Sequence, residues 1–97
     1  MESIDHIAIV VTNINHAVNW YIENRDCEVI YQDESLADLQ FENIKLALVL
    51  PHEHPAHIAF VDDSIENGTK HRDGSESVYD HDTFGNIIEK IKYETTK

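Results

Sequence analysis

Two histidines and one glutamate have the residue types and positions of a candidate metal site. The pattern H-I-A-x-V-x-x-x-I occurs twice, from His6 to Ile14 and from His57 to Ile65. A strand that is written twice and begins with histidine each time predicts two related modules that bring two imidazoles together. Glu89, which lies inside an apolar run, is the candidate third ligand.

The surroundings of Glu89 favour a metal. On a strand with a period of two, Glu89 shares its face with Ile87 and Ile91, where an unpaired carboxylate is costly. A bound cation would remove that cost. Two neutral imidazoles and one carboxylate suit a borderline divalent ion with open positions, and Zn, Ni, Fe, Mn and Co all fit this description. We therefore predict metal ligands at His6, His57 and Glu89, and we assign no separate catalytic residue or organic cofactor.

Other interpretations of the same residues stay open at this point. His6 and His57 could be rim or capping histidines without a metal, and Glu89 taken alone could be a solvated residue of an edge strand. His52 and His54 form the tract H-x-H-x-x-H with His57, which by itself resembles a metal-binding tract. Prolines flank the first two, and neither begins a repeated strand, so we predict that they belong to a linker.

The sequence gives less indication of a role for the other side chains that could bind a ligand or react. His71 and His81 are expected to be exposed, and Tyr79 and His81 lie near enough to the last predicted turn to reach a cavity. Cys27 begins a strand-like segment and is expected to pack as a small hydrophobic residue.

Composition excludes several classes of partner. The chain has 97 residues and a formal net charge of −12, which argues against nucleic acid and against anionic membrane surfaces. No apolar run approaches the ~18 residues that span a bilayer, and the N-terminus lacks the pattern of a signal peptide. A single cysteine cannot form an internal disulfide, so we expect a reducing, cytoplasmic environment.

Positions 1–51 read as a β-α-β-β-β module. A β-branched run over 5–11 predicts a strand, and Thr12 or Asn13 can cap the helix that follows. That helix has an apolar stripe at i, i+3, i+4 and i+7, made by Ile14, Ala17, Val18 and Tyr21. Three further strands are predicted over 27–32, 36–41 and 44–50.

Positions 55–95 read as a shortened second module of the same single domain, 1–97. The repeated strand covers 57–61, and 62–74 has room for only one or two helical turns before a loop. Two closing strands are predicted over 76–80 and 86–93, joined by a turn at 82–85. The helix and one strand of the first module have no full counterpart.

Three segments together resemble the vicinal oxygen chelate superfamily, the group of glyoxalases, bleomycin-resistance proteins and extradiol dioxygenases. The first is Asp5-His6-Ile7-Ala8-Ile9-Val10-Val11 with its Ala-x-x-Trp-Tyr helix, and the second is His57-Ile58-Ala59. The third runs from Tyr79 to Glu89 and is similar to the family ending D-P-x-G-N-x-x-E, with Thr83 in place of the usual proline. The resemblance covers essentially the whole chain.

The resemblance implies an α+β fold of paired βαβββ modules, glyoxalase-like, with the second module truncated and a shared cavity between curved sheets. The family's metal ligands map onto His6, His57 and Glu89. Ala8 and Ala59 share the histidine faces and leave room for an ion or substrate. The opposite faces carry large apolar side chains suited to packing beneath helices, namely Ile7, Ile9, Ile58 and Phe60. Relatives often pair or swap modules, so we expect a homodimer.

The chain also departs from the family. Four-ligand members such as glyoxalase I place a carboxylate on the fourth strand of the first module, and here that strand, 44–50, has no acid. A glyoxalase-type site is therefore incomplete unless water or a residue of the linker 52–54 substitutes. The short second module is expected to leave the cavity more open.

Two functions follow from these observations. The first is a divalent-metal-dependent enzyme, glyoxalase-like or dioxygenase-like, that acts on a small oxygenated substrate through the two-His one-Glu site. Isomerase, lyase and oxygenase chemistry all remain open. The alternative is a non-catalytic module that binds a small molecule, like the bleomycin-resistance branch. That branch does not need the ligand trio, and fold alone does not separate the two functions.

Overall fold

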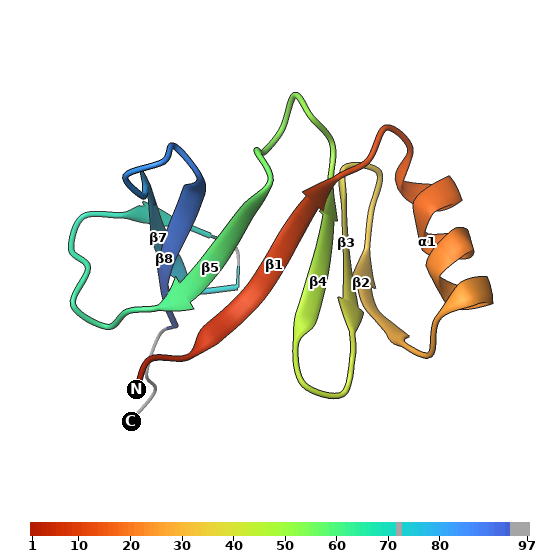
Figure 1. Cartoon of the computed structure of the whole chain (residues 1–97), viewed down its shortest axis with the longest axis horizontal. Helices are drawn as coiled ribbons and strands as arrows, with labels where there is room; N and C mark the ends of the chain where they lie inside the picture. Colours follow the sequence, from red (N-terminus) through yellow and green to blue (C-terminus); the bar gives the residue numbers. More distant parts are fainter. Residues whose placement is uncertain (72, 94–97) are drawn as a thin grey trace.

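A single eight-stranded sheet, strongly curved and partly covered by one helix, makes up the described part of the molecule (Figure 1). The structure is a computed structural model, and it describes residues 1–71 and 73–93. The elements are β1 (Ile4–Val10), α1 (Ile14–Asn24), β2 (Glu28–Gln32), β3 (Leu36–Gln40), β4 (Lys45–Val49), β5 (His57–Val61), β6 (Thr69–Lys70), β7 (Glu76–His81) and β8 (Ile87–Lys92). The predicted α+β class and the predicted β-α-β-β-β order of the first module are confirmed.

The two repeated strands lie at the centre of the sheet, whose order is β2-β3-β4-β1-β5-β8-β7-β6. β1 and β5 pair antiparallel, β1 pairs parallel with β4, and β5 pairs parallel with β8. Each module therefore contributes four consecutive strands, and the modules meet along the strands that carry the histidines. Figure 1 shows β1 and β5 running side by side across the middle of the molecule.

The main core lies between α1 and the first module's half of the sheet. The Asn13 side chain caps the helix by accepting a hydrogen bond from the His16 backbone N–H (2.9 Å). Ile14 and Val18 then face the sheet and are buried. The fully buried sheet residues beneath them are Ala37, Leu39 and Leu48.

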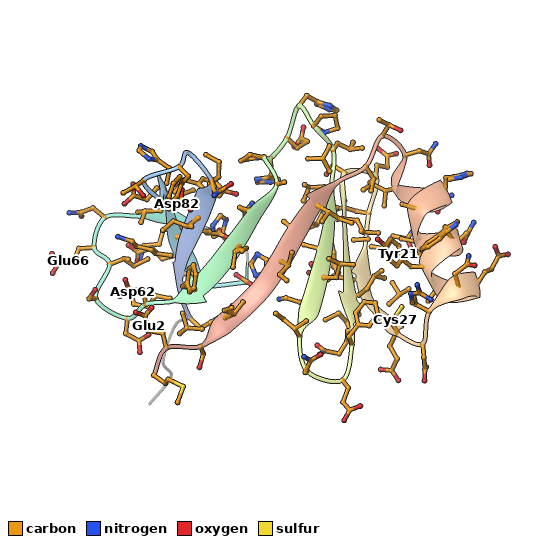
Figure 2. All side chains as sticks on the ribbon, in the orientation of Figure 1. Glu2, Tyr21, Cys27, Asp62, Glu66 and Asp82 are labelled. Atoms are coloured by element: carbon orange, nitrogen blue, oxygen red, sulfur yellow. The ribbon has the colours of Figure 1, made fainter. Side chains whose placement is uncertain are left out.

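Cys27 behaves as a packed hydrophobic residue, as predicted. It lies just after α1 and packs, with Tyr21, against the main core (Figure 2). Burial raises the pKa of its thiol, so the thiol is less prone to ionise than a solvated cysteine.

The second module differs from the prediction in two ways. Residues 62–68 form turns and bends, with no helix in this described segment, so the predicted helical turns are wrong. A two-residue strand, β6, does occur and pairs with β7 through Thr69–Ser77 and Lys70–Glu76. Two residues carry no periodic signal, which is why this strand reads as loop in the sequence.

The missing helix also overturns an expectation about burial. Ile9 packs against the core beneath α1, as predicted for a helix-covered face. Ile58 stays 40 % exposed, because the described part of the second module has no helix to replace α1. Figure 1 shows α1 beside β2 and β3 at one end of the molecule, and no helix over β5, β7 or β8.

The turn between β7 and β8 sets the register of the last strand. Asp82 accepts hydrogen bonds from the backbone N–H groups of Phe84 (2.8 Å) and Asn86 (2.9 Å). Gly85 has φ of +87°, a backbone conformation that favours glycine. The Asp-x-x-Gly-Asn sequence therefore builds a defined turn, and it places Tyr79 opposite Glu89.

The other predicted boundaries are accurate to about a residue at each end. The predicted second module extends to 95, and its last two positions lie outside the described residues. Within the described chain, no helix is long and apolar enough to span a membrane.

Candidate metal centre

The structure brings His6, His57 and Glu89 together in the middle of the sheet. The Nε2 atoms of His6 and His57 lie 3.2 and 3.1 Å from the same oxygen, Oε1 of Glu89. The two imidazole rings meet edge to face, with their centroids 5.5 Å apart. All three side chains are buried, and one potential ligand atom from each lies within 4.8 Å of the others.

Antiparallel pairing of the repeated strand explains why the histidines meet. His6 lies opposite Ala59, and Ala8 lies opposite His57, so each imidazole sits beside the other strand's alanine. Glu89 lies opposite Ala59 on the other side of β5. Side chains that pair directly across strands project from the same face of a sheet. The small alanines therefore leave space in which the three ligand atoms converge.

Hydrogen bonds at the far side of each ring fix which nitrogen faces the cluster. Nδ1 of His6 lies 2.7 Å from Oδ2 of Asp5, and Nδ1 of His57 lies 2.7 Å from the carbonyl oxygen of Pro55. Each Nδ1 must carry a hydrogen to make these bonds, which leaves Nε2 as the nitrogen with a free lone pair in the neutral ring. The Tyr93 hydroxyl donates to the same Asp5 oxygen (2.7 Å) and holds that carboxylate in place.

The cluster is strongly polarised. Burial lowers the pKa of His6, but hydrogen bonds with Asp5 and Glu89 outweigh burial and raise the pKa to about 9. Burial raises the pKa of Glu89, but hydrogen bonds with His57, His6 and Ser77 hold it far below its ordinary value. The lowered pKa of Glu89 keeps a negative carboxylate at the centre of the cluster. The raised pKa of His6 means that a metal ion would have to displace a proton from this imidazole.

The distances within the cluster suit a small divalent ion. An ion about 2.0–2.2 Å from nitrogen and oxygen ligands at roughly 90–110° separates neighbouring ligand atoms by about 2.8–3.6 Å. The two N···O distances of 3.1 and 3.2 Å fall within this range. The donor set and these two spacings therefore fit a divalent ion.

The strand pairing also shows where a fourth ligand would come from. Ala47 lies opposite Ala8 on β4, as Glu89 lies opposite Ala59 on β8. The repeat thus places Ala47 where the second module has its glutamate. Because alanine has no donor atom, the first module leaves one coordination position to water or substrate.

The linker 52–54 does not complete the cluster. Among the described residues, His52 and Glu53 pair only with each other (3.6 Å), and His54 Nδ1 instead lies 3.2 Å from the Tyr79 hydroxyl. His81 is exposed, and its Nδ1 lies 3.0 Å from the carbonyl oxygen of Asp82. The prediction that His52 and His54 are linker residues agrees with this placement.

β7 supplies one wall of the site. The Tyr79 ring packs edge-on against the His57 ring, with centroids 5.1 Å apart, and the residue is 45 % exposed. The Ser77 side chain hydrogen-bonds to Glu89, and the Ser77 hydroxyl also lies 2.7 Å from Nε2 of the exposed His71. Tyr79 therefore lies in contact with one of the three candidate ligands.

A second carboxylate, which the sequence analysis missed, lies on the same face of the sheet. Asp38 on β3 lies opposite Ala47, which in turn lies opposite Ala8. Burial raises the pKa of Asp38, and the charges of Lys45 and His6 lower it only in part. Among the described residues, no hydrogen bond or ion pair to its side chain is formed. The sequence analysis could have found Asp38, because it alternates on its strand with the apolar residues Ala37 and Leu39 and so must lie on the opposite face from them.

Comparison with solved structures identifies the architecture. No protein-family model and no curated protein matches the chain. A methylmalonyl-CoA epimerase in complex with methylmalonyl-CoA and NH4+ superposes with a TM-score of 0.78 at 17 % identity, over 100 % of this chain and 98 % of that one. This chain therefore shares its fold with that epimerase.

Two further structures have the same fold. A hypothetical protein from Bacillus halodurans C-125 has a TM-score of 0.79 at 18 % identity, with 99 % of this chain and 97 % of that chain covered. The Streptomyces coelicolor methylmalonyl-CoA epimerase variant S115T, in complex with 2-nitronate-propionyl-CoA, has a TM-score of 0.77 at 17 % identity, with 98 % and 96 % covered. At these identities the likeness concerns the fold.

Proposed function

We propose that the chain is a divalent-metal-dependent enzyme that moves a proton on a carbon next to a carbonyl group, as an epimerase or related isomerase does. The observation that carries the proposal is the convergence of His6, His57 and Glu89 on one buried point, where one potential ligand atom from each lies within 4.8 Å of the others. The comparison with methylmalonyl-CoA epimerases supports the fold on which such chemistry occurs.

The three ligand residues would hold the metal, and a bound divalent ion would act as a Lewis acid that stabilises negative charge on two adjacent substrate oxygens. Asp5 and the Pro55 carbonyl hold the imidazoles in the orientation that this requires. Ser77 orients the carboxylate of Glu89. Tyr79, on the wall beside His57, would donate a hydrogen bond to a bound substrate.

Asp38 is the candidate base for the proton transfer. Its carboxylate shares the cavity face with the ligands, has no partner among the described residues, and has a raised pKa caused by burial. A base with a raised pKa holds an abstracted proton better than an ordinary aspartate does. This carboxylate favours proton transfer over oxygenase chemistry, which does not need a second acid at this position.

The second candidate function is a small-molecule-binding module without catalysis. The exposed Tyr79 beside the cavity favours it, because an aromatic wall suits stacking with a planar ligand. Such a protein would not need an unpaired carboxylate at Asp38, where burial is unfavourable.

Metal content gives the first test. Protein purified without chelator and reloaded by dialysis is expected to bind one divalent ion per chain, measured by mass spectrometry of the metal. His57→Ala and Glu89→Ala are expected to lose it, and His52→Ala, in the exposed linker, serves as the matched histidine control. A wild-type protein that binds no ion, or a His52→Ala variant that loses it, would contradict the site.

Solvent deuterium exchange gives the second test and needs no knowledge of the product. We expect metal-loaded protein to catalyse exchange at the α-carbon of a 2-methyl-3-oxo acid or a 2-methylmalonyl thioester, followed by proton NMR. Asp38→Asn is expected to slow exchange by about 10²–10⁴-fold while retaining the metal. Stoichiometric metal with no exchange across acids, thioesters and hydroxyketones, together with saturable binding of an aromatic compound, would favour the binding module.

A further inference from the structure

Two hydrogen bonds through β7 connect the buried metal cluster to the surface of the molecule. Ser77 is 3 % exposed, and its side chain hydrogen-bonds to Glu89. The Ser77 hydroxyl also lies 2.7 Å from Nε2 of His71, an exposed residue between β6 and β7. A single hydroxyl group thus separates the exposed imidazole of His71 from the buried carboxylate.

Strand alternation explains why these three side chains meet. Ser77 pairs with Thr69 on β6, and His71 comes two residues after Thr69, so its ring lies on the side of the sheet to which Ser77 points. Glu89 on β8 lies opposite Tyr79, which is two residues after Ser77 on β7. Figure 1 shows β7 and β8 side by side. His71, Ser77 and Glu89 therefore share one face of the sheet.

The backbone around His71 forms a tight turn. The His71 N–H donates a hydrogen bond to the carbonyl oxygen of Ser75 (2.8 Å), and the Gly74 N–H donates one to the carbonyl oxygen of His71 (3.0 Å). Gly74 has φ of +90°, a conformation that favours glycine. The turn therefore holds the backbone of His71 in place, although its side chain is exposed.

The chemistry of the three groups determines the direction of both hydrogen bonds. Burial raises the pKa of Glu89, but its hydrogen bonds hold the pKa far below the ordinary value, so the group is a carboxylate that can only accept. Ser77 must then donate its one hydroxyl hydrogen to Glu89. The hydrogen of the other contact therefore belongs to Nε2 of His71, and the Ser77 oxygen accepts it.

We propose that His71 is a positioning residue of the metal centre, which directs the Ser77 hydroxyl at Glu89 and so holds the carboxylate in the orientation that binds the ion. A hydroxyl hydrogen can rotate, and donation from His71 favours the rotamer in which the hydrogen points at Glu89. Donation to the oxygen also polarises the hydroxyl, so each hydrogen bond strengthens the other. The inference rests on the metal site of the proposed function and adds a residue that is not itself a ligand.

Zinc affinity tests this role. The dissociation constant for Zn²⁺ is measured by competition with a chromophoric chelator for wild type, His71→Leu and His71→Gln. We expect His71→Leu to bind Zn²⁺ at least about 3-fold more weakly, because groups that orient a ligand contribute to metal affinity. His71→Gln keeps an N–H donor without the charge that an imidazole can carry, and it should bind within about 2-fold of wild type.

The matched control is His16→Leu, since His16 is exposed on α1. This variant is expected to bind Zn²⁺ like wild type. If His16→Leu and His71→Leu weaken binding by the same factor, the loss comes from removal of a surface histidine of any kind, and the proposal is wrong. The proposal is also wrong if His71→Gln binds as weakly as His71→Leu, because a donor at this position would then have no effect.

A double-mutant cycle tests whether His71 acts through Ser77. Ser77→Ala removes the hydroxyl, so His71→Leu is expected to cause no further loss of Zn²⁺ affinity in the Ser77→Ala background. If His71→Leu weakens binding by the same factor in both backgrounds, the imidazole acts on the ion independently of the hydroxyl. That result would overturn the proposal.

The visible absorption spectrum of Co²⁺-loaded protein gives a readout of ligand geometry that does not depend on activity. We expect His71→Leu to change the spectrum and His71→Gln to retain that of wild type. A lower Tm for His71→Leu with unchanged zinc affinity and cobalt spectrum would show that His71 only stabilises its turn, which contradicts its role but leaves the metal site intact. A wild-type protein that binds neither ion would instead contradict the metal site itself, and the inference with it.

Discussion

At the scale of single residues, each imidazole of the cluster has one nitrogen held by its own segment and one left for the centre. Asp5 holds His6 and the carbonyl of Pro55 holds His57, each at 2.7 Å. The residues that make these supporting contacts lie at different distances from His6 in the sequence. Asp5 is adjacent to its histidine, whereas the Tyr93 hydroxyl that anchors Asp5 comes from the other end of the sequence. The orientation of His6 therefore depends on both termini of the described chain.

Loss of the hydrogen bond between Asp5 and His6 is expected to weaken metal binding although all three ligands remain. Asp5→Ala frees the His6 ring to rotate and lowers the basicity of Nε2, so the dissociation constant for Zn²⁺ should rise about 10–100-fold in a competition titration with a chromophoric chelator. Asp62→Ala is the control, because Asp62 is a half-exposed aspartate of the second module whose side chain, among the described residues, hydrogen-bonds only with Ser64. Equal affinities for Asp5→Ala and wild type would show that His6 does not bind the ion through Nε2.

The pKa of His6 makes the stability of the metal-free protein depend on pH. His6 has a pKa of about 9 in the folded chain against an ordinary value of 6.5. A raised pKa stabilises the fold fully below pH 6.5, and this contribution is lost as the pH rises from 6.5 through 9. We expect the free energy of unfolding in urea, with EDTA present, to fall by about 2–3 kcal/mol between pH 6 and pH 10.

His6→Gln is the control for this titration, because its side chain stays neutral over the whole range. The variant should be less stable than wild type at pH 6 and should show a much smaller decrease toward pH 10. If both proteins lose stability in parallel, the decrease comes from other groups, and His6 is not protonated in the metal-free cluster.

At the scale of strands and helices, the repeat determines what each module offers to the cavity. Glu89 and Ala47 occupy equivalent positions, opposite the alanine that shares each histidine's strand. The first module therefore contributes an imidazole and an empty position, whereas the second contributes an imidazole and a carboxylate. The resulting three-ligand arrangement follows from one substitution within the repeat.

A glutamate at position 47, the equivalent of Glu89 in the first module, is expected to add a fourth metal ligand. Ala47→Glu should tighten Zn²⁺ binding at least 10-fold, because its carboxylate would start from the strand position that serves Glu89 in the other module. The same change should lower the stability of the metal-free protein, since it adds a buried like charge near Glu89. Ala47→Val is the control for added volume and should leave the affinity unchanged. An unaltered affinity in Ala47→Glu would contradict the equivalence.

At the scale of the whole molecule, a small core and a high net charge leave the fold in need of additional stabilisation. The main buried cluster lies only under α1, and the second module has no helix in its described part. Chains of about this length bury a modest fraction of their surface. A bound ion would add stabilisation that this small core does not supply.

Metal should accordingly stabilise the folded chain against heat. At a free Zn²⁺ concentration 100 times the dissociation constant, linkage adds about 2.7 kcal/mol, which corresponds to roughly 10–20 °C in Tm for a domain of this size. We expect this increase in differential scanning calorimetry for wild type and its absence for His57→Ala. A similar increase in both proteins would indicate that zinc binds elsewhere, such as at the exposed linker histidine His52.

Much of the fold was predictable because its signals are local. The strand over 57–61 was predicted with the bounds that the structure has, and the helix stripe from Ile14 to Tyr21 faces the sheet as its spacing indicates. The duplicated segment also predicted that two imidazoles and Glu89 would converge, and they do. A repeat encodes a long-range pairing in a local pattern, which is why this contact could be found without coordinates.

Other features depended on pairing that no local pattern encodes. The strand repeat, the helix and the three converging residues could all be predicted from the chain's residue order. The coordinates were needed to show that Tyr93 anchors Asp5, that Asp38 lies on the ligands' face of the sheet with no partner among the described residues, and that Ile58 is left partly exposed. The physical reason is that periodicity records which side of an element is buried, whereas strand register and the absence of a neighbouring helix are set by contacts between distant segments.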